Sequence, residues 1–324
     1  MNIQEILNGC TFETEGRRDR GQVASYHSKP SPRILTKTKY PVDVVGLKPV
    51  QRKNVLVLSG EHESRFTIGF EVEKNSLHRN AVKEYPLFCG FERDGSCGYE
   101  AVTNILPLLP EGKWRMKVYE MFKQAEKIID SRFSPADRRC GGHITITAKD
   151  STGVNYSGSE LAAMLRKNSG IIHALFAKRL SNPYCNGNLR MAPTGSDVQI
   201  VQGNGGRGGR YQLALERYFG GGVYGLEFRI VGRFESVKQM MRRYELFYEL
   251  LDYSINRPNG GFEGFLSKIK PIVYAMYEND IVKAEDRIER ARHYQRFINT
   301  GKITRLIAGD IDPQGRMRDM YDNF

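Results

Sequence analysis

Three short segments of the chain alternate between apolar and polar residues, with the two-residue period of a half-buried β-strand. They are residues 66–74, 143–148 and 223–231. Each has one apolar face that can pack into a core and one face that carries polar groups. On the first segment, Glu71 and Glu73 project to the same side, two positions apart. Two carboxylates this close repel each other unless a cation lies between them.

Apolar residues recur at helical spacing between and after these strands. We expect helices at 114–129, 159–180, 236–255, 265–277 and, on the surface, 281–296. Gly170 weakens the second of these helices, and Pro271 should kink or break the fourth. A further short strand is expected near residues 54–58. Strands followed by helices in this order predict an α+β fold, a mainly antiparallel sheet with helices packed on it.

The 324 residues suffice for one large domain or two small ones. Residues 1–55 mix Gly, Pro, Ser and basic residues without periodicity, which predicts a basic, partly disordered extension. We expect one globular domain at 56–280, followed by a C-terminal helix and polar tail at 281–324. Residues 17–20 and 287–296 are basic stretches that we interpret as solvated faces.

Charge and cysteine content narrow the class of protein. The net charge of +12 favours an anionic partner: a nucleotide, a nucleic acid or an acidic substrate. The chain has no apolar run of 18 residues, so no membrane-spanning helix is expected. Its five cysteines follow no zinc spacing, and no apolar signal segment opens the chain, which together predict reduced thiols and a cytoplasmic protein.

The polar faces of the other two alternating segments also carry side chains that can bind a metal ion or a phosphate group. His143 lies on the polar face of the second, and Glu227 and Arg229 share the polar face of the third. If the three strands lie side by side in one sheet, these groups gather with Glu71 and Glu73 over a single surface. For the first segment alone, a solvent-facing edge with two ordinary glutamates is the alternative.

Further oxygen ligands are available between the first two strands. Asp94-Gly95-Ser96 is a turn signal, and it is either a plain surface turn or the carrier of ligands. Glu92 or Asp94, together with Glu100, can add carboxylates to the same surface. Several carboxylates with one imidazole suit Mg²⁺ or Mn²⁺, whereas a structural zinc site would require more Cys or His.

Such ions commonly hold the β- and γ-phosphates of ATP during phosphoryl transfer. Arginine complements them, because a guanidinium meets phosphate oxygens in a two-pronged hydrogen bond. Arg229 faces the site by the strand argument, and Arg190 and Arg210 lie just before that strand.

Four motifs in this order resemble the amidoligase family, carboxylate–amine ligases of the glutamine synthetase-like superfamily. They are Gly69–Glu73, the turn at 94–96 with Gly98–Glu100, Gly141–His143 and Leu226–Arg229. The resemblance covers about residues 60–255 and implies a glutamine synthetase-like catalytic domain. The segments 176–185, which contains Arg179, and 210–212 also look like arginine-bearing segments of the family.

The resemblance implies a role for each of these residues. One metal ion would be held by Glu73, Glu100 and either Glu92 or Asp94. A second would be held by Glu71, His143 and Glu227. Arg229 would stabilise the phosphoryl group. The candidate catalytic residues are Arg229, Arg210 and Arg190, and the candidate nucleotide-binding residues are Arg229, Arg210 and Arg179.

The implied reaction joins a carboxylate to an amine through an acyl phosphate, at the expense of ATP. The chain departs from the family at Thr145, where a second histidine is common, and at Ala101–Asn104, where Ile-Val-Ser-Pro is common. These departures concern the substrate more than the ATP and metal chemistry. The alternatives are an inactive member and a non-catalytic basic scaffold, associated with nucleic acid or a virion, whose N-terminal arm binds an anionic partner.

Two other signals are set aside. Gly203–Gly208 matches G-x-G-x-x-G, but the helix that a dinucleotide site requires does not follow, so we interpret it as a loop. Cys140 is an unsuitable nucleophile, because three residues of strand or turn keep it away from His143.

Overall fold

The computed structural model is described over ten segments: residues 47–52, 55–60, 65–78, 87–94, 96–103, 106–176, 179, 200–201, 214–220 and 223–298. The chain divides into two compact units. The first comprises Met1–Val154, Phe219–Gly221 and Arg233–Met241, and the second comprises Asn155–Tyr218, Gly222–Gly232 and Arg242–Phe324. None of the described helices is both long enough and apolar enough to cross a membrane.

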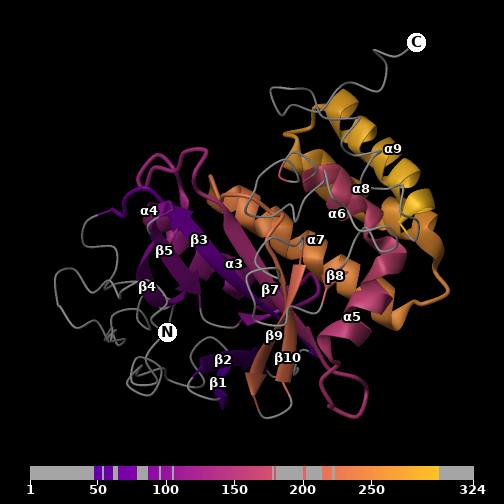
Figure 1. The fold of residues 1–324 in the computed structure, drawn as a ribbon, viewed down its shortest axis with the longest axis horizontal. Coiled ribbons are helices and arrows are strands. Elements are labelled where there is room, and N and C mark those ends of the chain that lie inside the picture. Colours follow the sequence, from indigo (N-terminus) through magenta and orange to yellow (C-terminus); the bar gives the residue numbers. More distant parts are fainter. Residues whose placement is uncertain are drawn as a thin grey trace. The chain divides into compact units, whose positions relative to one another are not determined.

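The first unit is built on an antiparallel sheet with the strand order β4-β5-β3-β7 (Figure 1). Its strands are β3 (Phe66–Lys74), β4 (Phe88–Asp94), β5 (Gly98–Thr103), β6 (Leu106–Pro107), which also pairs with β3, and β7 (Gly142–Ala148). A separate antiparallel pair is formed by β1 (Leu47–Arg52) and β2 (Val55–Gly60). The expected α+β character is confirmed, and β3 is a central strand.

The apolar face of β3 packs against helices of the same unit. These are α3 (Lys113–Gln124) and α4 (Glu126–Ile129), which divide the single helix expected at 114–129. Phe70 is buried, with its ring edge-on to Phe122 at 5.7 Å and to Phe234 at 5.6 Å between ring centroids. The helices therefore cover one face of the sheet, and the acidic residues of β3 project from the other.

Lys74 ends β3 on the apolar face and is completely buried. Its ammonium group donates hydrogen bonds to the carbonyl of Ile129 at 2.7 Å, the carbonyl of Phe234 at 2.8 Å and the hydroxyl of Ser131 at 3.2 Å. Burial lowers the pKa of Lys74 to about 8. The side chain thus links the end of α4 to the segment before α7, a role that alternation alone does not reveal.

The second unit contains most of the remaining elements. They are α5 (Gly158–Leu165), the 3₁₀ turn η2 (Arg166–Asn168), α6 (Gly170–Phe176), β8 (Ile200–Val201), β9 (Ala214–Gly220), β10 (Val223–Phe228), α7 (Val237–Asn256), α8 (Gly261–Met276) and α9 (Ile281–Phe297). The last two residues of β9 and the first five of α7 belong to the first unit. Strand β9 neighbours β10 and pairs in parallel with β8. Helices α6, α8 and α9 pack together (Figure 1).

The prediction of a single helix at 159–180 is wrong, because α5 and α6 are separate helices. Ser157 and Glu160 form a capping box that starts α5, and α6 starts afresh at Gly170. The amide of Gly170 donates to the side chain of Gln295 on α9 at 2.9 Å, and a Cβ here would lie 2.6 Å from the Ala291 carbonyl oxygen. A close approach of α9 therefore fixes this break.

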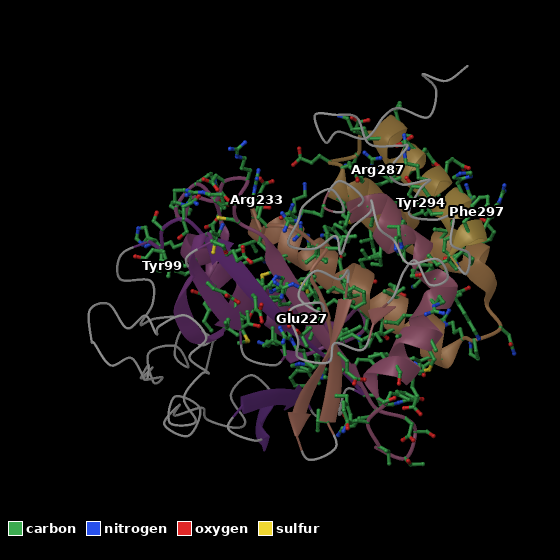
Figure 2. The ribbon with its side chains drawn as sticks, viewed as in Figure 1. Tyr99, Glu227, Arg233, Arg287, Tyr294 and Phe297 are labelled. Carbon is green, nitrogen blue, oxygen red and sulfur yellow. The ribbon has the colours of Figure 1, made fainter. Side chains whose placement is uncertain are left out.

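Two expectations about the C-terminal helices are resolved in part. Of the kink or break expected at Pro271, the break is wrong, because helix α8 continues through this residue; the carbonyl that loses its partner lies on the exposed face around Ser267. The basic stretch 287–296 is not simply a solvated face, because Arg290 is 1% exposed and donates to Asp286 at 2.9 Å. Figure 2 marks Arg287 and Tyr294 on the same helix.

His173 on α6 should make stability depend on pH. Burial lowers its pKa to about 4 from an ordinary 6.5, and its Nδ1 lies 2.8 Å from the Ser169 carbonyl oxygen. As the pH falls, His173 is therefore protonated in the unfolded chain before it is protonated in the folded chain. Stability should be fully present above pH 6.5 and fall towards pH 4, by up to about 3 kcal/mol. Urea unfolding followed by circular dichroism should show a smaller loss in His173→Leu, and an equal loss would contradict the assignment.

Candidate metal site

An imidazole lies between two carboxylates on the polar face of the first unit. Glu71 on β3 is directly opposite His143 on β7, and Nδ1 of His143 contacts Oε2 of Glu71. The other ring nitrogen, Nε2, lies 3.7 Å from Oε1 of Glu73. The shared polar face predicted for Glu71, Glu73 and His143 is therefore confirmed within this unit.

The carboxylate of Glu73 is also bound by a backbone N–H group. Its Oε2 accepts a hydrogen bond from the backbone N–H of Gly141, in the glycine pair that precedes β7. The residue is 7% exposed, and its strand has neighbours on both sides. The alternative of a solvent-facing edge with two ordinary glutamates is therefore wrong.

A third carboxylate adjoins this pair through the strand register. Glu100 on β5 lies directly opposite Glu73, and the backbone of Glu92 on β4 lies directly opposite Glu100. Residues paired in this way share one face of the pleated sheet, where like charges repel. Asp94 pairs instead with Gly98 at the end of the hairpin, which confirms the predicted turn. A row of acidic positions thus crosses three strands.

The second unit holds Glu227 together with two arginines. Glu227 on β10, labelled in Figure 2, is 1% exposed. Its Oε1 accepts a hydrogen bond from Arg229 at 2.6 Å, and its Oε2 accepts one from Nε of Arg217. Strand β10 ends at Phe228, so Arg229 reaches Glu227 from beyond the strand rather than from within it.

Arg217 was missed by the sequence reasoning. It lies on β9, and the glycine run 220–222 falls between the end of β9 and the start of β10. Read as a hairpin turn, it would have placed residues 214–219 beside 223–228 and drawn attention to this arginine.

Of the other three predicted arginines, one lies within the described residues. Arg179 lies beside the segment after β10, where a Cβ at Gly232 would be 3.3 Å from its Cδ. Gly232 has a φ of +68°, a conformation that favours glycine. Arg190 and Arg210 lie outside the described residues, as does the 203–208 glycine segment.

No protein-family model matches this chain, and a search of curated proteins finds no similar one. The resemblance to the amidoligases therefore rests on the four motifs in the sequence.

The residues of the first unit fit a divalent cation. Glu71, Glu73 and Glu100 carry a formal charge of −3 when ionised, and a protonated His143 would return only +1. Buried or half-buried carboxylates at this spacing require further positive charge. Oxygen donors with one imidazole are the ligands that Mg²⁺ and Mn²⁺ accept.

The thiol next to this site is a poor nucleophile. Cys140 is free and buried, and burial raises the pKa of its thiol. The thiolate, which is the reactive form, is therefore disfavoured. This supports the rejection of a cysteine mechanism on the sequence.

Proposed function

We propose that this protein is an ATP-dependent carboxylate–amine ligase with a glutamine synthetase-like catalytic domain. The observation that carries the proposal is the imidazole of His143 between Glu71 and Glu73 on the polar face of a central strand. Glu100, directly opposite Glu73, extends the set of oxygen donors. This donor set is suited to Mg²⁺ or Mn²⁺ and accounts for three acidic positions gathered on one face.

The chain's own residues have two tasks in this reaction. Glu71 and His143 would hold one cation and Glu73 with Glu100 a second, as the resemblance implies, and the bound cations would neutralise the phosphates of ATP. Arg229 is anchored on Glu227 and would donate its other N–H groups to phosphate oxygens. The resemblance also assigns Glu227 to the ion held by Glu71 and His143, and this assignment stays a prediction.

The proposed reaction has two steps. A substrate carboxylate oxygen attacks the γ-phosphorus of ATP, ADP leaves, and an acyl phosphate forms. The amine nitrogen then attacks the acyl carbon, inorganic phosphate leaves, and the nitrogen loses a proton as the amide forms. Positioning and charge neutralisation supply the rate in such a reaction, without a covalent enzyme intermediate.

ADP release tests the proposal. With ATP, Mg²⁺ and a panel of carboxylates and amines, we expect ADP formation to require one member of each class. Glu71→Gln and Glu227→Gln should each lower the rate by at least about a hundredfold, since each removes a charge that positions phosphate or metal. Glu111→Gln, at an exposed position, is the matched control and should keep the wild-type rate. Unchanged turnover in both site variants would defeat the assignment.

The net charge of +12 favours a second function, a non-catalytic scaffold that binds nucleic acid. Phosphate contacts make such binding fall steeply with salt. On the ligase account, ATP binds tightly only with Mg²⁺ and nucleic acid binds weakly. Steeply salt-dependent binding of nucleic acid without any Mg²⁺-dependent ATP binding would establish the scaffold instead.

A further inference from the structure

The polar face of the first unit is open at one place along β3 and β7. Of the nine residues of β3, only Gly69 and Glu71 are half-buried, and the other seven are buried. Of the seven residues of β7, only Thr145 is half-buried, and the other six are buried. Gly69 and Thr145 are directly opposite each other in the register, two positions along from Glu71 and His143 and on the same face. The exposed part of this face therefore adjoins the candidate metal site.

Neither backbone conformation nor packing requires glycine at position 69. Its φ lies outside the left-handed region that favours glycine. A Cβ built there would meet, among the described residues, only Oγ1 of Thr103 at 3.9 Å, an ordinary van der Waals distance. Glycine inside a strand is destabilising, and it often marks a place where a ligand approaches the backbone closely.

Thr145 supplies a polar group at the same place. Its hydroxyl has no hydrogen-bond partner within the described part of the chain, and the residue is half-buried. The next threonine pair along the register differs, since the hydroxyls of Thr67 and Thr147 lie 2.5 Å apart and both residues are buried. Thr145 therefore has an available donor beside the bare backbone of Gly69.

We propose that Gly69 and Thr145 form the floor of the subsite for the carboxylate substrate. This inference rests on the proposed ligase function. A carboxylate is flat enough to lie on the glycine backbone, and one of its oxygens accepts a hydrogen bond from the Thr145 hydroxyl. The adjacent Glu71 repels an anion, so the carboxylate binds only after a cation occupies the site. An amine would show the opposite dependence on the metal.

Paramagnetic broadening of ligand NMR signals tests the subsite. Protein loaded with Mn²⁺ is mixed with a panel of free amino acids and simple carboxylic acids. We expect at least one acid to be broadened by the wild-type protein, but not when Mg²⁺ replaces Mn²⁺. Gly69→Val should weaken binding of that acid by at least about tenfold, with Gly69→Ala intermediate. Affinity for Mn²⁺ should be unchanged in both variants.

The hydrogen bond from the Thr145 hydroxyl to the acid is tested by separate variants. Thr145→Val should weaken binding of the acid, and Thr145→Ser should retain it. Thr147→Val is the matched control, because it removes a hydroxyl on the same strand and face that Thr67 already engages. It should leave the broadening unchanged. If Gly69→Val does not fold, Gly69→Ala decides the outcome, since the space accepts a Cβ.

The outcomes separate the subsite from the ligase proposal. Equal broadening in wild type and the Gly69 variants overturns the subsite, as does a Mn²⁺-loaded wild type that broadens no acid. In both cases the metal site stands. A wild-type protein that binds no Mn²⁺ overturns the ligase proposal and the subsite with it.

Discussion

The Glu73→Gln variant is expected to lose about a thousandfold or more in ADP formation. Glutamine keeps the size of the side chain, and its amide oxygen can still accept the hydrogen bond from Gly141. The variant therefore removes the charge and leaves the loop before β7 in place. Loss of one anionic ligand removes several kcal/mol of charge stabilisation at a divalent ion, which corresponds to about three orders of magnitude in rate.

The control for this prediction is Glu120→Gln, a partly exposed glutamate on α3 whose salt bridge with Lys117 spans 4.0 Å. It should behave like the wild type. Turnover of Glu73→Gln within tenfold of the wild type would show that the carboxylate between Gly141 and His143 is structural. A variant that loses both turnover and its cooperative thermal transition would point to the same conclusion.

The Lys74→Met variant is expected to lower the free energy of unfolding by about 3–5 kcal/mol. Methionine matches the length of the lysine stem but leaves the buried carbonyls of Ile129 and Phe234 without their donor. Each unsatisfied buried carbonyl is destabilising by about 1–3 kcal/mol. Urea unfolding measures the difference, with Lys123→Met as the control at an exposed position of α3.

Lys74 follows Glu73 in the sequence but belongs to the opposite face of the sheet. Affinity for Mn²⁺ should therefore be retained by Lys74→Met at temperatures where the variant is folded. If Lys74→Met lowers the free energy of unfolding by less than about 1 kcal/mol, the structural role of Lys74 is contradicted. Loss of metal binding in a folded variant would place the ammonium group in the site instead.

Much of the fold follows from periodicity in the sequence. The alternation of 66–74 predicts both the strand and its two faces, because the apolar set packs on α3 and the acidic set does not. The break between α5 and α6 could not be predicted, since it depends on the close approach of α9 to Gly170. Arg290 pairs with Asp286 one turn earlier on the same helix, which the sequence spacing allows, but the burial of Arg290 does not follow from that spacing.

For the candidate site, the sequence predicts which residues of a single strand share a face, but not which residues of different strands lie opposite each other. The pairing of Glu71 with His143 requires the register of β3 on β7, which depends on contacts 72 residues apart. The buried position of Glu73 depends on the backbone of Gly141, and the role of Arg217 depends on the β9–β10 turn. The first two are tertiary facts that no local pattern contains, whereas the glycine run 220–222 is a local signal for the third.

The claim that His143 and Glu71 hold a divalent cation is tested most directly by pulsed electron paramagnetic resonance of bound Mn²⁺. The account predicts that wild-type protein binds Mn²⁺ and that the spectrum contains coupling to one imidazole nitrogen. His143→Gln should abolish that coupling. No bound Mn²⁺ at millimolar concentration, or bound Mn²⁺ whose nitrogen coupling persists in His143→Gln, would contradict it.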